Sequence, residues 1–514
     1  MARIVVVGAG IGGLSAALLL GRAGHRVTVC ERDAAPAPLS PEEAWSGWPR
    51  PGTPQARLGH SFLAGFRREL RRRLPDVLDA VLHAGTPELD MTMWLAAGTE
   101  WVPQDAELFI LRARRPVFEA VLRRAAEAEP TVQVQAGCPV QGLLADPPRP
   151  GGVPRVNGVS TSSEAITADV VVVSGGRSVP IARWFEAIGA TPPSEQAESC
   201  GSACYTRYFR TLAADDDAGR IDAGPTIHRD PAYLLYEVWG ADNHTFACEI
   251  AVPISDRPLK LLRDEATWMA AAATIPEIQE WIDPQRSQPI TQGVDVMGNE
   301  RNTIRRFVEH GRPLAHGVHV IGDARCQTDS LYAWGCGNAL MAAAAVADAM
   351  TDHPTDDEAQ ALYVAAAVDE ELGGRHAYSV ARNHARDRAR RSEPRWDTLK
   401  AGVGLIDGVL LPAADHSADV YRALYRWDLQ LDPAGDLEMN TAVIEAARRV
   451  NGDSIEPPLD TDGIPTREQL LDAIADRRRD SSRARASSAV AMRGGTVRPC
   501  SARKSPPHGP GGGA

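Results

Sequence analysis

Cysteine is scarce in this chain: eight cysteines are scattered over 514 residues, and no Cys-x-x-Cys pair is present. This pattern excludes a small disulfide-stabilised fold and favours a reducing compartment, so we expect a cytoplasmic protein. Cys200 and Cys204 lie four residues apart, but no matching pair of histidines accompanies them. We therefore predict no zinc site and no other metal centre.

Long apolar segments are missing as well. The apolar start of the chain, Ile4 to Leu20, is interrupted by four glycines, and no run of 18 apolar residues is free of glycine and charge. We therefore expect neither a signal peptide nor a membrane span. The formal net charge of −12 gives no indication of a nucleic-acid partner. No Ser/His/Asp triad is recognisable either.

The first 31 residues have the pattern of a β-α-β unit. A β-branched strand is predicted at 4–7, a helix at 14–22 and a second strand at 27–30. The turn between the first strand and the helix reads Gly8-Ala9-Gly10-Ile11-Gly12-Gly13. In such a loop Gly8 permits the tight turn, Gly10 lets a phosphate approach the backbone, and Gly13 lets helix and strand pack closely.

The acidic residue at the end of the second strand completes this dinucleotide-binding pattern. Glu31 is placed to accept hydrogen bonds from ribose hydroxyls, and the helix N-terminus offers N–H donors to a pyrophosphate. Ala17 and the pair Glu31-Arg32 favour FAD over NAD. We expect the cofactor to contact Gly8, Gly10, Ile11, Gly12, Gly13, Glu31 and Arg32.

Further elements follow along the chain. Residues 34–56 are predicted to be a long loop, and helices are predicted over 62–74, 116–127, 267–281 and 339–350. Strands are predicted over 132–135, 168–173, 233–238, 245–252 and 317–321. Residues 355–478 read as mostly helical, with the basic run Arg382–Arg391 interpreted as a solvated helix face. Residues 481–514 contain no acidic residue and are predicted to be a disordered tail.

A second acidic and glycine-rich pattern lies far from the first. Asp323 directly follows the predicted strand at 317–321, where its carboxylate can accept a hydrogen bond from a ribityl hydroxyl of FAD. The stretch from Tyr332 to Ala339 opens a long Ala-rich helix. There the backbone N–H groups of Gly335 and Cys336 are expected to face the flavin, and the helix dipole would favour negative charge on reduced flavin. The alternative is that Asp323 caps a turn.

These motifs together resemble the FAD-dependent aromatic hydroxylase superfamily, the group A flavoprotein monooxygenases, and within it a bacterial branch of polyketide epoxidases and related oxidoreductases. The similar stretches span about residues 1–350. They are Gly8–Gly13 with Glu31, Pro54–Arg57 with His60, Arg115 with Phe118-Glu119, Asp169–Arg177, Arg183-Trp184 and Gly322–Ala339.

The resemblance implies roles for further residues. Arg115 would contact FAD near the ribityl and pyrophosphate groups, and Val140 would make a backbone contact at the adenine end. Gln55, Arg57 and His60 would lie in a loop beside the flavin. His60 is either a pH-sensitive contact or a cap of the following helix. Asp169 with Gly175 and Gly176 would serve the cofactor and the reductant.

The chain departs from the family pattern at two positions. The family usually has proline where this chain has Ser330 and glycine where it has Ala333, in the segment beside the oxygen-reaction face of the flavin. Asp329 is an extra carboxylate in the same loop. It is either a solvated turn residue or a residue that shapes the electrostatic field of the active site. The catalytic side chains are unknown, and the candidates near the flavin are Ser330, Ala333 and His60.

The resemblance implies an α/β fold: a discontinuous Rossmann-type FAD-binding domain with a β-sheet substrate domain and a helical C-terminal region. We predict the FAD-binding domain at 1–195 and 311–352, the substrate domain at 196–310, the helical region at 353–478 and the tail at 479–514. Trp94, Trp101 and Tyr332 are candidates to line an apolar substrate cavity. The thiols of Cys326 and Cys336 would lie near the flavin, with buried packing as the main interpretation.

The expected function is that of an NAD(P)H-driven monooxygenase. In the family, NAD(P)H reduces the flavin and leaves, and oxygen then adds at flavin C4a to give a hydroperoxide that transfers one oxygen atom to a small organic substrate. The outcome is hydroxylation or epoxidation of an apolar or aromatic, natural-product-like compound. The alternative is an FAD-dependent oxidase, dehydrogenase or reductase without oxygen insertion, which the Ser330 and Ala333 departures favour. A flavin halogenase is a weaker alternative, because its Trp-x-Trp-x-Ile-Pro signature is missing.

Overall fold

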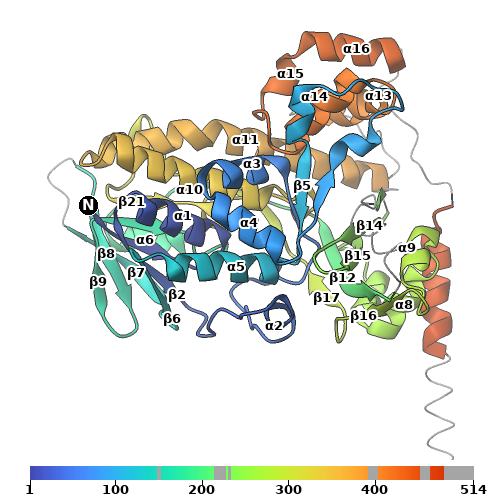
Figure 1. The fold of residues 1–514 in the computed structure, drawn as a ribbon, viewed down its shortest axis with the longest axis horizontal. Coiled ribbons are helices and arrows are strands. Elements are labelled where there is room, and N and C mark those ends of the chain that lie inside the picture. The colour runs from blue at the N-terminus through green and yellow to red at the C-terminus, as the bar shows by residue number, and fades with distance from the viewer. Residues whose placement is uncertain (147–151, 213–226, 230–232, 392–402, 452–462, 480–514) are drawn as a thin grey trace, which may run out of the picture.

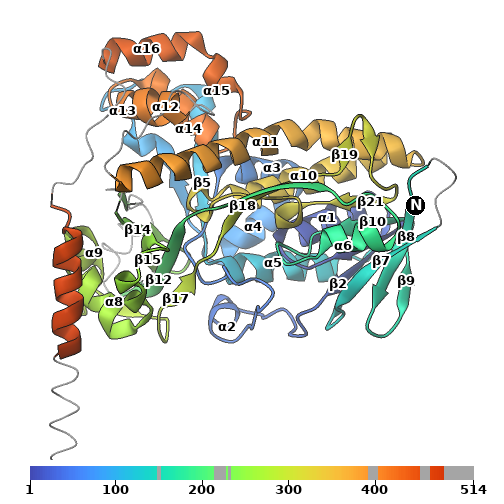
Figure 2. The ribbon, with the colours of Figure 1, turned by 180° about the vertical axis from the view of Figure 1, so that it is seen from behind.

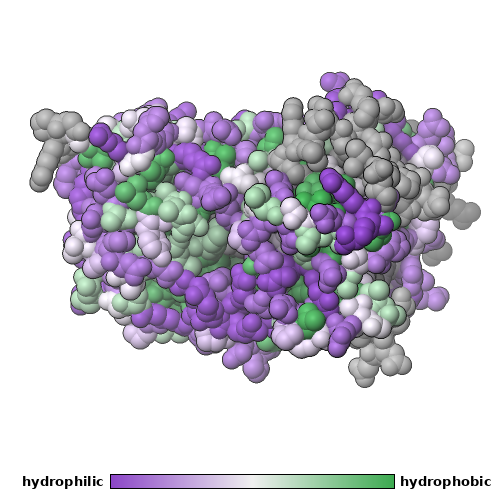
Figure 3. All heavy atoms as spheres, turned by 90° about the horizontal axis from the view of Figure 1, so that it is seen from above, coloured by the Kyte–Doolittle hydropathy of each residue, from purple (hydrophilic) through white to green (hydrophobic). Residues whose placement is uncertain are grey.

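The structure, a computed structural model, describes residues 1–146, 152–212, 227–229, 233–391, 403–451 and 463–479. A parallel sheet with its helices forms one half, and an antiparallel sheet with two short helices forms the other (Figure 1). On the face seen in Figure 3 the described residues are mainly hydrophilic, and hydrophobic residues gather only in small groups. None of the described helices is both long and apolar enough to cross a bilayer.

The parallel sheet is built from two regions that are distant in the sequence. Its strand order is β21-β10-β1-β2-β6. These strands are β1 (Arg3–Val7), β2 (Arg26–Glu31), β6 (Val132–Ala136), β10 (Val170–Val173) and β21 (Val318–Val320). All five predicted strands of this half are present, and β21 enters the sheet from beyond the other half of the molecule. The expected discontinuous α/β architecture is therefore confirmed.

Both faces of this sheet are covered, which explains why its strands are β-branched throughout rather than alternating. Ile4, Val6 and Val172 pack against three helices, α1 (Ile11–Arg22), α5 (Arg115–Ala128) and α10 (Trp334–Asp352). Val5 and Val171 pack on the opposite face. That face is covered by α6 (Ile181–Ala187) and a three-stranded sheet of β7 (Val140–Asp146), β8 (Arg155–Thr161) and β9 (Ala165–Thr167), as Figure 2 shows from behind.

The second sheet is antiparallel and has strand order β13-β14-β15-β12-β16, with β17 also paired to β12. These strands are β12 (Ser202–Thr211), β13 (Ile227–Arg229), β14 (Leu235–Gly240), β15 (Thr245–Pro253), β16 (Ser287–Pro289) and β17 (Asp295–Met297). Tyr236, Phe246 and Ile250 alternate onto the face that packs against Trp268. The residues between them, Glu237 and Glu249 among others, point to the opposite face, which lines a cavity.

Two local predictions are corrected by the structure. The segment 267–281 forms two helices, α8 (Glu265–Ala272) and α9 (Pro276–Trp281), because Pro276 lacks an N–H group and starts a new helix at its first position. The segment 34–56 is not entirely loop, since it contains α2 (Pro41–Ser46). The side chain of Ser40 caps this helix by accepting a hydrogen bond from the backbone N–H of Glu43 (3.2 Å).

The C-terminal region is helical where it is described, but it packs in several places. Helix α11 (Asp357–Arg390) runs along α10. Helices α14 (Ala418–Asp428) and α16 (Thr441–Asn451) share a core with β5 (Phe109–Arg112), and the helical residues 467–479 pack through Leu470 and Ile474 on the second sheet. The predicted tail lies outside the described residues.

Only part of the basic run at the end of α11 is a solvated face. His384 and Arg391 are exposed, as predicted. Arg386 is 3% exposed and lies 3.8 Å from the buried carboxylate of Asp329, and Arg382 contacts Asp407 at 2.7 Å. For these two arginines the interpretation from sequence was wrong, because their partners come from distant segments.

One buried ion pair joins the two halves. Arg114 precedes α5, and Asp242 lies in the turn between β14 and β15; both side chains are fully buried. The Arg114 guanidinium donates to the Asp242 carboxylate at 2.6 Å, and the Arg114 backbone N–H donates to it at 2.6 Å as well. Without Asp242 the buried Arg114 would keep Glu42, 3.2 Å away and largely exposed, as a carboxylate that compensates its charge only in part.

We therefore expect Asp242→Asn to lower the free energy of unfolding by about 3–5 kcal/mol, the usual effect of breaking a buried pair. Asp387→Asn is the matched control, because its partner Arg391 is exposed in α11, and it should cost at most about 0.5 kcal/mol. Urea unfolding of both variants measures the difference. Equal losses would show that the Arg114–Asp242 pair does not hold the halves together.

Candidate active site

A large cavity lies between the two halves, with a volume of about 360 Å³. Its lining comes from the Gly8–Gly12 loop, the end of β2, the segment 50–61, the segment after β10, the segment 322–339 and the face of β14 and β15. Of the predicted cofactor residues, the cavity is lined by Gly8, Gly10, Ile11, Gly12, Glu31, Arg32, Gln55, Arg115, Val140, Asp323, Gly335 and Cys336. The three candidates Ser330, Ala333 and His60 also line it.

Each glycine of the first loop is required, or leaves space, for a different structural reason. Gly8 has φ +98°, and a Cβ there would lie 2.7 Å from the Ser174 carbonyl oxygen. A Cβ at Gly13 would lie 1.9 Å from the Gly8 carbonyl oxygen, so Gly13 serves helix–strand packing and lies outside the cavity lining. A Cβ at Gly10 would meet no atom within 4 Å. Gly10 therefore leaves open the space at the N-terminus of α1, where a phosphate group fits.

The end of β2 carries an acidic residue with a buried arginine beside it. Glu31 accepts hydrogen bonds from the backbone N–H groups of Ala9 (2.7 Å) and Asp33 (2.9 Å). Arg50 lies 3.8 Å from Glu31, and its guanidinium donates to the Ala9 carbonyl oxygen at 3.2 Å. Arg50 is 4% exposed and lines the cavity. Sequence analysis missed it because only the fold brings residue 50 to the Gly8–Gly13 loop.

Arg115 and His60 meet at the cavity wall. Arg115 donates to Glu119 at 2.8 Å, and its guanidinium lies 3.4 Å from Nε2 of His60. Nδ1 of His60 lies 2.9 Å from the Leu58 carbonyl oxygen, so this nitrogen carries the proton and Nε2 can accept from Arg115. Burial, together with Arg115, lowers the pKa of His60 to about 4. His60 is therefore neutral near pH 7 and does not act as a pH-sensitive contact in that range.

The capping alternative for His60 is also wrong, since the following helix α3 (Ala64–Arg73) has Leu63 at its N-cap. The charge of Arg115 is instead balanced by Glu119. Burial disfavours the Glu119 carboxylate, but Arg115 and Arg50 hold its pKa below the ordinary value. Arg115 lines the cavity beside this carboxylate, and its contact with FAD stays a prediction.

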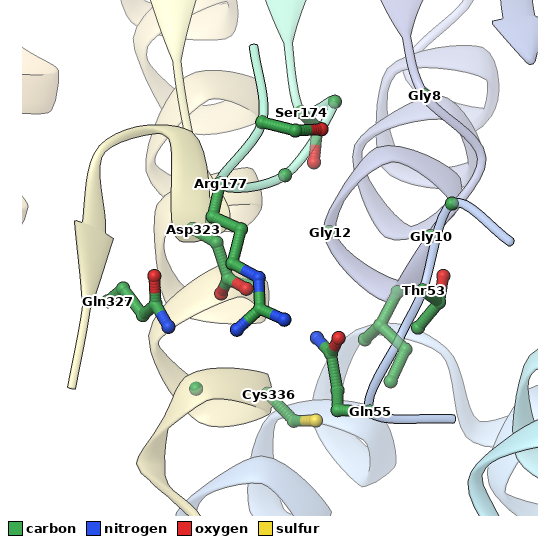
Figure 4. Close-up of a pocket in the computed structure, with 18 of the residues that line it drawn as sticks. Gly8, Gly10, Gly12, Thr53, Gln55, Ser174, Arg177, Asp323, Gln327 and Cys336 are labelled. Atoms are coloured by element: carbon green, nitrogen blue, oxygen red, sulfur yellow. The ribbon is translucent and has the colours of Figure 1, made fainter. Parts of the chain in front are cut away.

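Asp323 and Arg177 approach each other across the cavity. In Figure 4 the Arg177 side chain extends between Asp323 and Gln55, with Cys336 below. Burial raises the pKa of Asp323, and the neighbouring Arg115 and Arg177 oppose this shift. Asp323 thus lines the cavity, and within the described residues its carboxylate accepts no backbone hydrogen bond that would cap a turn. Arg177 was expected only as part of a family stretch and becomes a central lining residue here.

The lining fits the FAD that the motifs imply. Gln55 has a buried Oε1 without a hydrogen-bond partner, which leaves an acceptor for a ligand donor. The first turn of α10 contains Gly335 and Cys336, whose backbone N–H groups have no intrahelical acceptor. With Gly10 at one end and this helix N-terminus at the other, the cavity offers donors and positive potential for a pyrophosphate and a flavin ring.

The loop that departs from the family pattern contains two strained or buried features. Ala333 has φ +54°, the left-handed region that favours the family's glycine. The Ser330 hydroxyl donates to Glu300 at 2.6 Å. Asp329 is 2% exposed, so the interpretation as a solvated turn residue is wrong, and the alternative that it shapes the field of the site stands.

Several predicted residues lie away from the cavity lining. Arg57 turns toward Trp45, donating to its carbonyl oxygen at 2.9 Å with its guanidinium over the indole ring. It lies outside the cavity lining, and its contact with FAD stays a prediction. Asp169 lies at the start of β10 and binds Arg3, at the opposite end of that strand from Gly175. The aromatic residues proposed to line the substrate cavity are elsewhere, and Trp184 and Trp239 line it instead.

The reason for the aromatic error is the C-terminal core. Tyr332 stacks on Trp334 with 4.8 Å between ring centroids, Trp94 packs against the same cluster, and Trp101 is 60% exposed. Cys326 and Cys336 are buried, and burial raises their thiol pKa values to about 12 and about 11, which favours the packing interpretation. Within the described residues no group of three or more His, Cys, Asp or Glu side chains has metal-binding geometry.

Comparison with known proteins places this geometry in context. Residues 3–131 match the family of FAD dependent oxidoreductases. No curated protein matches the chain in sequence. Three solved structures share the fold, each with less than a fifth of residues identical. They are a probable FAD-dependent monooxygenase, pqsL, from Pseudomonas aeruginosa (18% identity, 76% of this chain and 98% of that chain, TM-score 0.53), the myxobacterial chondrochloren halogenase CndH (17%, 91% and 99%, 0.53), and the flavin-dependent halogenase CmlS (17%, 94% and 78%, 0.54).

The family match covers residues 3–131 and concerns FAD dependent oxidoreductases. The solved structures show that the fold of this chain is shared with flavin-dependent enzymes. The identities are too low to transfer a substrate or a reaction, and these are argued below from the cavity itself.

We expect Gly10→Ala to weaken FAD binding without affecting folding. The added methyl group enters open space, so the free energy of unfolding of the FAD-free protein should change by less than about 0.5 kcal/mol, whereas FAD affinity should fall about tenfold or more. Gly435→Ala is the control, since its Cβ also meets nothing and Gly435 lies outside the cavity lining. Unchanged FAD affinity in Gly10→Ala, measured by fluorescence titration, would contradict this site.

We expect Ala333→Gly to stabilise the protein. Relief of the left-handed alanine conformation contributes about 1–2 kcal/mol, and the greater backbone entropy of glycine in the unfolded chain offsets part of this by about 0.4–1 kcal/mol. Ala347→Gly, in the interior of α10, should instead lose about 1 kcal/mol. Thermal unfolding compares the two variants. A loss in Ala333→Gly as large as in Ala347→Gly would show that residue 333 is not strained.

Proposed function

We propose that this protein is an FAD-dependent monooxygenase that uses NAD(P)H and molecular oxygen to insert one oxygen atom into a small organic substrate. The observation that carries the proposal is the continuity of the cavity. One space connects the Gly8–Gly12 loop and the Asp323 segment with a wall of β14 and β15 that belongs to a different sheet. This arrangement gives a cofactor site and a substrate site that share an interior.

The bound FAD would supply the redox and oxygen chemistry. The protein's own residues would bind and orient it. Gly10 leaves space for phosphate, Arg50 and Arg115 provide positive charge, and Asp323 can accept a hydroxyl proton in a hydrogen bond. The N-terminus of α10 favours negative charge on the flavin ring.

Exclusion of water would come from the second half of the molecule. Trp239 on β14 and Leu331 in the loop after Asp329 line the cavity between polar groups. Their apolar surfaces reduce the water available to a reactive intermediate and strengthen the fixed charges around the substrate. Hydroxylation and epoxidation both require such a dry space, and the proposal includes either outcome.

The shared fold also includes halogenases, and the departures at Ser330 and Ala333 favour a flavoenzyme without oxygen insertion. The same experiment separates these activities. We expect the purified protein with FAD to show oxidised flavin absorption bands, to lose them on anaerobic addition of NADH or NADPH, and to regain them with oxygen. Mass spectrometry with ¹⁸O₂ should then detect one labelled oxygen atom in an accepted organic compound.

Each contrary result has a definite meaning. Absence of flavin bands after FAD addition would overturn the cofactor assignment. Reduction by NAD(P)H with peroxide as the sole oxygen product in the presence of a turned-over substrate would identify an oxidase or dehydrogenase. Incorporation of bromide or chloride into the product would identify a halogenase.

A further inference from the structure

The cavity wall formed by the second sheet carries two carboxylates side by side. Glu237 on β14 lies directly opposite Glu249 on β15 in the antiparallel register, and Thr206 on β12 lies opposite Glu249 on its other side. Such neighbours have Cβ atoms about 5 Å apart, and like charges in this position repel each other. Both carboxylates are buried, at 2% and 6% exposure, and both line the cavity.

The Glu249 carboxylate is only partly satisfied by the protein. Its Oε2 accepts a hydrogen bond from the Thr206 hydroxyl at 2.5 Å. Among the described residues, no arginine, lysine or histidine forms an ion pair with Glu249 within 4.0 Å. An uncompensated carboxylate in this position is costly unless it is protonated or meets a cation.

Two further carboxylates reach the cavity from the loops facing this wall. Glu300 lies 3.8 Å from Arg177, and Asp329 lies 3.8 Å from Arg386, both longer than hydrogen-bonded ion pairs. Asp329 is 2% exposed, and its Oδ2 has no hydrogen-bond partner although it lies in the lining. This orphaned oxygen is a second, independent sign that a donor is missing from the site.

Burial raises the pKa of three of these carboxylates, those of Glu249, Glu300 and Asp329. Burial and the nearby Asp329 raise the pKa of Glu300 to about 8. Burial and Glu237 raise the pKa of Glu249 to about 7. A cation among these groups would favour their charged forms and release protons. The thiols of Cys200 and Cys204 near them are also buried, and burial raises their pKa values further above neutrality, so they do not supply charge.

An organic cation fits this set better than a metal ion. The carboxylates come from two strands and two loops, and no group of three described ligands has metal-binding geometry. The indole of Trp239 lines the cavity two residues from Glu237 on the same strand. An aromatic face beside carboxylates is the usual environment of a bound ammonium group.

We propose that Glu237, Glu249, Glu300 and Asp329, with Trp239, form a subsite for a positively charged nitrogen, so that the substrate of this protein is an amine-bearing organic molecule. This inference rests on the proposed monooxygenase function, and it adds the chemical class of the substrate to that function. The amine would neutralise the acidic wall and fix the orientation of the substrate between the second sheet and the cofactor-binding residues.

The test measures binding and needs no turnover. FAD-supplemented protein is titrated calorimetrically at about pH 7 with three probes of similar shape: 2-phenylethylamine, 2-phenylethanol and phenylacetate. We expect the amine to bind about tenfold more tightly than the alcohol, and phenylacetate more weakly than either. Glu249→Gln and Glu300→Gln should each reduce the preference for the amine to about threefold or less.

Glu277→Gln is the matched control. Glu277 accepts a hydrogen bond from Tyr236, which lies on the opposite face of the same sheet, so the preference for the amine should be unchanged. A second measurement requires no variant. Amine binding to the wild-type protein should release protons, seen as different binding enthalpies in phosphate and Tris buffers at the same pH.

Equal affinities for the amine and the alcohol, tighter binding of phenylacetate, or displacement of the amine by millimolar Mg²⁺ or Ca²⁺ would overturn the proposal. Its failure is distinguishable from failure of the proposed function. A protein that binds FAD and oxygenates a neutral compound but does not prefer the amine overturns only this inference. A protein that prefers the amine but takes up no FAD supports the cation subsite and overturns the monooxygenase proposal.

Discussion

The parallel register of the central sheet is the constraint on which the candidate cofactor site depends. Val7 lies opposite both Val173 and Cys30, and Val173 lies opposite Val320. Four strands therefore end at one edge of the sheet. The residues that follow these strands are brought together there by the strand pairing itself. At this edge the backbone itself requires a glycine, because Gly8 lies too close to the segment after β10 for any side chain to fit.

The second sheet must be held at a fixed distance from this edge, and buried charges contribute to that. Arg114 and Asp242 join the start of α5 to the β14–β15 turn. At the other side of the cavity, Arg386 at the end of α11 faces Asp329. Buried pairs of this kind add little stability compared with apolar packing, but they penalise any arrangement that separates their members. They therefore define the cavity more than they strengthen the fold.

The charged groups differ between the two ends of the cavity. At the cofactor end Arg50 and Arg115 lie among the carboxylates of Glu31, Asp33 and Glu119, and two helix N-termini add N–H donors that suit phosphate groups. The wall of β14 and β15, with the loops facing it, is rich in carboxylates. A site that accepts an anionic cofactor at one end and a cationic group at the other orients both by charge, in an interior where such interactions are weakly screened. Burial, with Arg115 acting in the same direction, lowers the pKa of His60 to about 4, and burial, with Asp329 acting in the same direction, raises the pKa of Glu300 to about 8.

Three features could be predicted before the fold was known: the first β-α-β unit, the Gly8–Gly13 loop with Glu31, and the strand that leads to Asp323. These features are local: each depends on hydrophobic periodicity and on glycines within about 30 residues of one another, so they can be recognised before the fold is known. The predicted domain division remains a prediction of this kind.

Tertiary structure alone decided which polar groups share the cavity. The alternation of side chains along a strand fixes the face on which Glu237 and Glu249 each lie. Pairing of β14 with β15 places the two residues opposite one another. Packing of the two halves of the molecule then turns that face toward the cavity. The cavity is lined by Arg50 and not by Arg57, seven residues further along the same loop. A loop has no periodic pattern, so the sequence could not indicate which of the two arginines reaches the cavity. Buried charge is a property of partners that are distant in the chain, and a sequence records the residues without recording which of them meet.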